Sequence, residues 1–154
     1  MTRAGVTAVA LAALVTLAGC HTPPPSGGSE LVIGMTNAPT NLDPGVGLDE
    51  ASQKLHTLLF SSLLKIDESL RIVPDLAIRF ENPNPTTYVA EVRHGVRFHD
   101  GRELTADDVA FTFRRFLDPK FVSGRKGAYK MIASVDVLDR YTVAFHLSEP
   151  SGSF

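Results

Sequence analysis

The chain has 154 residues, a formal net charge of −2 and a single cysteine. This length is enough for one hydrophobic core, and the near-neutral charge offers no basic footprint for nucleic acid. A lone cysteine also excludes an internal disulfide.

The first 19 residues have the layout of a secretory signal. Arg3 supplies a positive charge, and an uncharged run of small and apolar residues extends from Ala4 to Gly19. The run is shorter than the stretch of about 18 residues that suggests a membrane-spanning helix. We therefore predict a signal peptide over residues 1–19.

Cys20 closes the sequence Leu-Ala-Gly-Cys, which resembles a bacterial lipobox. The resemblance implies cleavage just before Cys20 and acylation of its thiol, and two or more acyl chains give stable membrane anchoring. The alternative is an ordinary small residue at the end of the signal peptide. Residues 20–29 contain three prolines followed by Ser-Gly-Gly-Ser, a composition typical of a tether between a membrane and a folded domain.

Residues 30–154 are predicted to form one mixed α/β domain. The branched apolar run Leu31–Met35 predicts a buried strand, and residues 36–47 have the composition of turns. Further strands are predicted at 63–66 and 87–92, with a turn at 67–69 and a short helical turn at 74–78. A helix is predicted from near Asp49, with one apolar stripe formed by Ala51, Leu55, Leu58 and Leu59.

The segment from Thr105 to Leu117 predicts the best-defined helix. Thr105 is a good N-cap, and Asp108 three residues later approximates a capping box. Phe111 lies off the predicted stripe, which suggests that the helix is covered on two sides. The stripe consists of Val109, Phe113, Phe116 and Leu117. Segments 135–138 and 142–147 predict a hairpin that turns at Asp139–Arg140, so most strands should be antiparallel.

The stretch from Val96 to Pro119, VRFHDGRELTADDVAFTFRRFLDP, resembles the signature of bacterial extracellular solute-binding proteins of family 5. These proteins serve peptide and nickel importers of the ATP-binding-cassette type. Four other pieces agree with the family in order and spacing. They are LVIGMTNAPTNLDP, LLFSSLLKID with VPDLAIRFE, TTYVAEVRHG, and VDVLDRYTVAFHLSEP.

The resemblance implies the amino-terminal lobe portion of a two-lobed periplasmic-binding-protein fold of type II, cluster C-like. It implies capture of a peptide or similar organic solute outside the cytoplasmic membrane and delivery to permease and ATPase subunits. It implies no cofactor and no catalysis. Family members are several times longer, so we expect a truncated product or partial sequence. The alternative is a genuine short protein, which would be a binding or sensory lipoprotein without transport.

Most of the signature is also explained as a folding module. Asp100-Gly101 suits a tight hairpin turn, and Phe98 beside it should pack on the sheet. A metal cluster formed by His56, His94 and His99 is the alternative to ordinary surface or turn histidines. No catalytic motif with a nucleophile and base at a recognised spacing is present, so a hydrolase ranks lowest.

The resemblance places the solute-contacting wall at Leu48, Asp49, Glu50 and Ala51. In peptide binders this loop offers backbone groups to an extended peptide, and Asp49 or Glu50 could pair with its amino terminus. The alternative is that Asp49 caps the helix and Glu50 complements its dipole. Tyr129 is a further candidate for lining the pocket, against the alternative of an ordinary strand or loop aromatic.

Overall fold

The computed structural model describes residues 32–152. The chain divides into two compact units, residues 1–34 and 35–154, and the described part of the first has no regular secondary structure. The predicted strand at Leu31–Met35 is wrong for its described residues 32–35. Val32 is 80% exposed, and no described strand pairs with this segment, so its backbone has no ladder to join.

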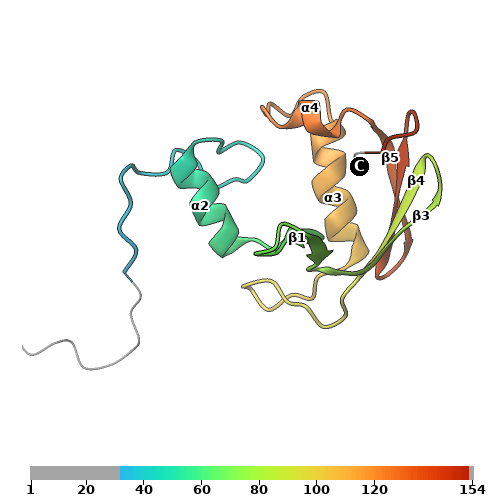
Figure 1. Ribbon diagram of the computed structural model, residues 1–154, viewed down its shortest axis with the longest axis horizontal. Coiled ribbons are helices and arrows are strands. Elements are labelled where there is room, and N and C mark those ends of the chain that lie inside the picture. Colours follow the sequence, from blue (N-terminus) through green and yellow to red (C-terminus); the bar gives the residue numbers. More distant parts are fainter. Residues whose placement is uncertain (1–31, 153–154) are drawn as a thin grey trace, which may run out of the picture. The chain divides into compact units, whose positions relative to one another are not determined.

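The main sheet has the strand order β3-β4-β6-β5, with every neighbouring pair antiparallel (Figure 1). Its strands are β3 (Ala77–Asn84), β4 (Thr87–Val92), β5 (Ile132–Asp139) and β6 (Thr142–Leu147). The predicted strand at 87–92 and the predicted hairpin are confirmed. The hairpin turns at Arg140–Tyr141, one residue later than predicted, because Asp139 already pairs with Thr142. The mixed α/β class with antiparallel strands is confirmed.

A separate hairpin joins β1 (Leu64–Ile66) to β2 (Ile72–Pro74). The predicted strand at 63–66 and the turn after it are confirmed, but the predicted helical turn at 74–78 is wrong. Pairing overrides local composition there, since Ala77 N–H donates to the carbonyl of Leu63 at 2.9 Å. The strand β3 was not predicted, because its charged, Asn and Pro residues show no alternation and suit an edge strand.

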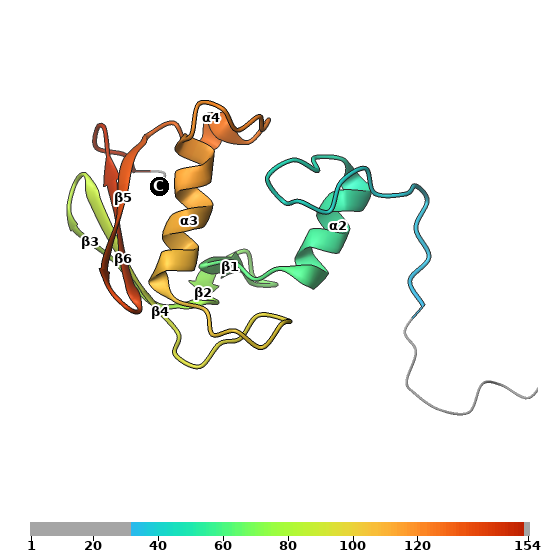
Figure 2. The same ribbon diagram turned by 180° about the vertical axis from the view of Figure 1, so that it is seen from behind.

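The helix α3 (Ala106–Leu117) lies against one face of the main sheet (Figure 2) and confirms the predicted helix. Its N-cap is Thr105, whose backbone N–H donates to the Asp108 carboxylate at 2.9 Å. Val109 is buried as predicted, whereas the aromatic part of the stripe is half-buried. Phe111 is 69% exposed, so coverage on two sides is not observed within the described residues.

The core lies between α3 and the sheet. Phe145 on β6 is 1% exposed, and its ring packs edge-on against Phe113 with ring centres 4.8 Å apart. On β4, Ala90 and Val92 are fully buried. The buried cluster comprises Ala77, Ala90, Val92, Leu104, Ala106, Val109, Ala110, Ile132, Val135, Val143, Phe145 and Leu147.

The predicted turn at Asp100-Gly101 is confirmed. Gly101 has φ +86°, a conformation that favours glycine, and its N–H donates to the carbonyl of Phe98 at 2.9 Å. The expectation that Phe98 packs on the sheet is wrong. Its side chain is exposed, and the Arg102 guanidinium lies 4.4 Å from its ring centre, so a cation–π contact replaces burial.

Two further helices complete the described part of the chain. They are α2 (Glu50–Leu59) and the short α4 (Lys126–Tyr129). Within residues 32–152, no helix combines the length and the apolar composition that crossing a bilayer requires.

Candidate functional site

The segment Leu48–Ala51 forms the start of α2, as predicted, and Asp49 is the helix N-cap. The Asp49 carboxylate accepts hydrogen bonds from the backbone N–H of Ser52 at 2.9 Å, from the Ser52 hydroxyl at 2.6 Å and from the Thr40 hydroxyl. These bonds, led by that of the Ser52 hydroxyl, hold the pKa of Asp49 below its usual range. Asp49 is therefore ionised and committed to capping the helix.

The side chain of the next residue, Glu50, does not cap the helix. Its side chain is exposed and pairs with Lys54 one turn later, at 2.6 Å between Nζ and Oε1. The hydrogen bond from Lys54 lowers the pKa of Glu50. Exposed pairs of this kind are weak, so Glu50 can exchange Lys54 for another cation at little cost. A shallow, open depression on this face of α2 is lined by Glu50, Gln53, Lys54 and Thr57.

Backbone groups are also available at this helix start. The N–H groups of Glu50 and Ala51 make no hydrogen bond to any described residue, because the first turn of a helix lacks intrahelical acceptors. Leu48 is exposed, and Ala51 is buried. The segment therefore presents uncommitted N–H donors, one apolar side chain and one exchangeable carboxylate.

The buried face of α2 differs from the predicted stripe. Its buried residues are Ala51, Ser52 and His56, whereas Leu58 and Leu59 are exposed among the described residues. The reason is that α2 packs on a polar loop rather than on the main core. The Ser52 hydroxyl accepts from the N–H groups of Thr40 and Asn41, and His56 Nε2 donates to the Asn41 carbonyl at 3.2 Å.

The loop before α2 is joined to the region after α3 by several contacts. Arg115 forms a two-pronged ion pair with Asp43, with distances of 2.5 and 3.2 Å, and this pair lowers the pKa of Asp43. The Ser123 hydroxyl donates to the Gly45 carbonyl. No functional role was predicted from the sequence for Asp43, Arg115 or Ser123. The remaining signal was Asp43 itself, in the Leu-Asp-Pro turn of the resemblance.

Tyr129 lies in α4 and packs against the edge of the core. Its ring contacts Phe113 and Phe116, with ring centres 5.6 and 4.5 Å apart. Within the described residues it makes no hydrogen bond or ring contact with the segment Leu48–Ala51. The structure thus places Tyr129 in an aromatic cluster, and its predicted role in lining a pocket stays a prediction.

The three histidines considered as a metal cluster lie in different surroundings. His56 is buried beside the loop before α2, and His94 stacks on Tyr141 with ring centres 3.9 Å apart. His99 lies at the exposed hairpin turn. Across residues 32–152, no group of three or more His, Cys, Asp or Glu side chains is placed to hold a metal ion.

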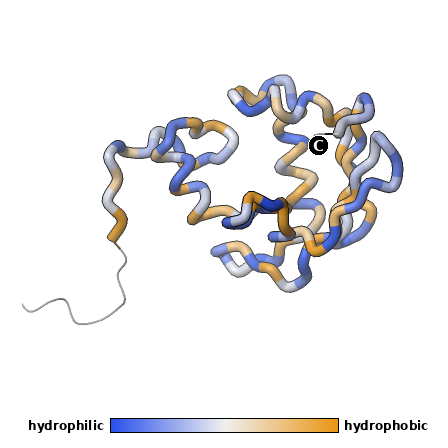
Figure 3. Tube along the Cα trace, viewed as in Figure 1, coloured by the Kyte–Doolittle hydropathy of each residue, from blue (hydrophilic) through white to orange (hydrophobic). Residues whose placement is uncertain are grey.

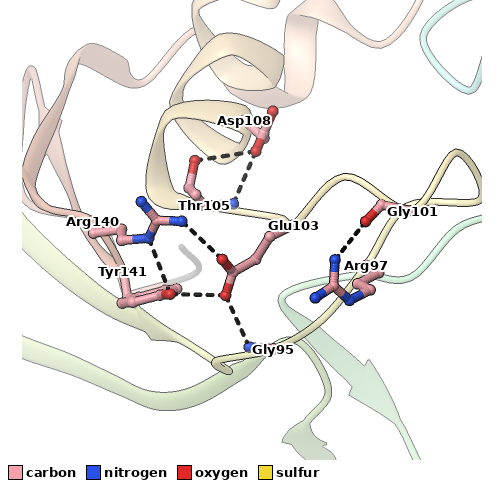
Figure 4. Close-up of polar contacts among 8 residues, drawn as sticks. All are labelled: Gly95, Arg97, Gly101, Glu103, Thr105, Asp108, Arg140 and Tyr141. Atoms are coloured by element: carbon pink, nitrogen blue, oxygen red, sulfur yellow. Dashed lines mark hydrogen bonds and ion pairs between the residues drawn. The ribbon is translucent and has the colours of Figure 1, made fainter.

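A polar network ties the signature hairpin to the turn between β5 and β6 (Figure 4). The Glu103 carboxylate accepts from Arg140 at 2.8 Å, from the Tyr141 hydroxyl at 2.8 Å and from the Gly95 N–H at 3.3 Å. Arg140, Tyr141 and burial act on this carboxyl, and the hydrogen bonds outweigh burial and lower its pKa to about 2. The network supports the view that the signature is mainly a folding module.

This network predicts a pH-dependent stability. Because the folded-state pKa of Glu103 is depressed from 4.5 to about 2, its contribution is present above pH 4.5 and disappears as the pH falls toward 2. We expect Glu103→Gln to lower the urea midpoint near neutral pH and to converge with the wild type in acid. Glu68→Gln, at an exposed residue without hydrogen bonds or ion pairs among the described residues, is the control. A difference independent of pH would contradict the network.

Comparison with known proteins places the chain in a family. Residues 71–154 match the family described as bacterial extracellular solute-binding proteins, family 5, middle part. The oligopeptide-binding protein AppA of Bacillus subtilis is 37% identical over 131 residues, which cover 84% of this chain and 24% of AppA. The glutathione-binding protein GsiB of Escherichia coli strain K12 is 27% identical over 153 residues, which cover 99% of this chain and 29% of GsiB.

The chain is also similar to solved structures of solute-binding proteins. AppA in complex with a nonapeptide superposes with a TM-score of 0.69 at 36% identity, covering 71% of this chain and 22% of AppA. NikZ of Campylobacter jejuni in complex with Ni(L-His) gives a TM-score of 0.69 at 30% identity, covering 77% of this chain and 24% of NikZ. The chain spans about a quarter of the length of these relatives. The matched family segment takes in more than half of the chain, and the predicted fold is confirmed by these neighbours, so the chain belongs to the bacterial extracellular solute-binding proteins of family 5.

Proposed function

We propose that this chain is the amino-terminal part of a substrate-binding lipoprotein of an ATP-binding-cassette importer. The complete protein captures a peptide or a similar organic solute between two lobes and delivers it to the permease. It performs no chemistry on the solute. The named specificities of relatives, oligopeptides for AppA and glutathione for GsiB, support a peptide-like ligand.

The proposed site is supported by a contrast between the bonded Asp49 side chain and the unbonded backbone N–H groups at the start of α2. The Asp49 carboxylate is committed to Ser52 and Thr40, whereas the N–H groups of Glu50 and Ala51 have no acceptor among the described residues. An extended peptide offers carbonyl groups that fit such donors. The exposed Glu50 carboxylate adds a partner for a peptide's amino group.

Substitutions at Glu50 test this assignment in the complete protein. We expect Glu50→Gln to change the preference among peptides by a few-fold without abolishing binding, because the backbone supplies most of the affinity. Calorimetry with a defined peptide pool measures this, with Glu68→Gln as the isosteric control. The 154-residue chain alone should bind weakly, since it presents one wall. Tight binding by the short chain would contradict the two-lobe account, and peptide turnover would contradict the non-enzymatic role.

We also propose that the protein is anchored on the outer face of a membrane. The proposed signal peptide at 1–19, the lipidated Cys20 and the tether at 20–29 all lie outside the described residues. The sequence Leu-Ala-Gly-Cys and the extracellular family support this anchoring. Cys20→Ala should abolish lipidation and block the cleavage before residue 20, because both steps of the proposed lipobox require the cysteine. Unchanged processing together with membrane retention would rule out the anchor.

A further inference from the structure

The segment Thr40–Leu59, which contains the proposed wall, lies outside the hydrophobic core between α3 and the main sheet. Among the described residues, no hydrophobic side chain from 36 to 62 belongs to the buried core cluster or to the half-buried side chains packed against it. Figure 3 shows hydrophobic stretches along α3 and the main sheet, whereas α2 is mostly hydrophilic until its carboxyl end. The hydrophobic core therefore does not fix the position of the wall, and other contacts must do so.

The strongest of these contacts is made by Arg115, near the carboxyl end of α3. Its guanidinium forks onto both carboxylate oxygens of Asp43 and lies 4.0 Å from the ring centre of Phe121. The pair is partly shielded, with side-chain exposures of 40% for Arg115 and 29% for Asp43. A two-pronged arginine–carboxylate contact fixes orientation as well as distance.

The segment that follows α3 contacts the loop before α2 at two further points. Phe121 leaves no room at Gly45, where an added Cβ would lie 2.8 Å from the ring atom Cζ. Gly124 lies against Leu48, where an added Cβ would come within 2.5 Å of a Leu48 methyl carbon. The segment after α3 therefore reaches the first residue of the proposed wall directly.

Hydrogen bonds within the loop transmit this restraint from Asp43 to α2. The N–H groups of Val46 and Gly47 donate to the Asp43 carbonyl at 2.9 Å, and the Gly45 N–H donates to its carboxylate at 2.8 Å. His56 then joins the Asn41 carbonyl to the middle of α2. Because these bonds connect the loop to α2, a restraint on the position of Asp43 also restrains the position of the wall.

We infer that Arg115 is a positioning residue, which acts through Asp43 to hold the segment Thr40–Leu59 in the orientation that solute binding requires. The role of this segment as a solute-contacting wall rests on the proposed function. The restraint itself does not depend on a ligand, so it can be measured without one.

Hydrogen–deuterium exchange of the purified full chain tests the restraint. Arg115→Met should raise the exchange rates of amides in residues 40–59 about 5-fold, as expected for loss of roughly 1 kcal/mol of ion pairing. Amides of β4 and β6 should keep their rates. Arg115→Lys should be intermediate, because lysine keeps the charge without the fork. Arg71→Met is the matched control, since it removes a similar arginine–aspartate pair in the β1–β2 turn.

Asp43→Asn keeps the acceptor for the Gly45 N–H and removes the charge, so it tests whether Arg115 acts through Asp43. The double variant Asp43→Asn/Arg115→Met should exchange no faster than the faster single variant. Unchanged exchange in 40–59, equal acceleration throughout the chain, or additive effects would each overturn the inference.

Calorimetry of the complete protein with the defined peptide pool is a separate experiment. Absence of peptide binding there would reject the proposed function and leave the exchange result decisive for Arg115.

Discussion

Replacing Phe145 with alanine should lower the free energy of unfolding by about 3–5 kcal/mol. Phe145 is 1% exposed on a central strand of the main sheet and packs edge-on against Phe113 of α3. Truncation removes buried apolar surface and leaves a cavity, since the neighbouring strands pair through backbone hydrogen bonds and cannot collapse far. Small domains have only about 5–15 kcal/mol in total, so this change brings the fold near its limit.

Urea denaturation of the wild type and the variant measures this loss. Phe111→Ala is a matched control, because it removes the same side chain from an exposed position on α3. A surface substitution of this kind should alter stability by no more than about 0.5 kcal/mol. A small loss for Phe145→Ala, or equal losses for the two variants, would contradict the assignment of the core.

Gly47→Ala should separate the loop before α2 from the helix at a cost of about 1–3 kcal/mol. An added Cβ would lie 2.2 Å from the Asn41 carbonyl oxygen, 2.9 Å from Ser52 Cβ and 3.1 Å from His56 Cε1. The first of these neighbours is backbone and the others belong to the buried face of α2, so the loop must move away. The His56–Asn41 hydrogen bond should be lost with that movement.

Amide exchange in residues 40–59 and urea denaturation together measure the effect of Gly47→Ala. Gly127→Ala is the control, because no atom lies within 4 Å of its added Cβ. The control should be neutral or slightly stabilising, since alanine restricts the unfolded chain. Native exchange rates in the Gly47→Ala variant would contradict the close packing of the loop on α2.

Elements with strong local signals were predicted correctly. Thr105 and Asp108 mark the start of α3, and the alternating residues of β4 point to the core, so both elements are encoded by neighbours in the sequence. The strand β3 and the segment 74–78 depend on pairing with distant residues. Local composition is therefore a poor guide there, and the same holds for the run at 31–35, which lacks a partner among the described strands.

In the candidate site, too, locally encoded features were predictable and contacts between distant residues were not. The cap at Asp49 was predictable, because a helix start favours a short polar side chain. The partners of the cap required the structure, which shows the Asp49 carboxylate bound by Ser52 and Thr40, and pairing of Asp49 with a solute stays a prediction. The Asp43–Arg115 pair joins residues 72 positions apart, a separation that no local pattern encodes.

In our proposal, the segment Leu48–Ala51 is a solute-contacting wall that binds mainly through its backbone. A structure of the complete protein with a bound peptide tests this proposal. We predict that peptide carbonyl oxygens lie within about 2.7–3.2 Å of the backbone nitrogens of Glu50 or Ala51, with Asp49 still capping α2. A bound peptide that makes no contact with residues 48–51 would contradict the account.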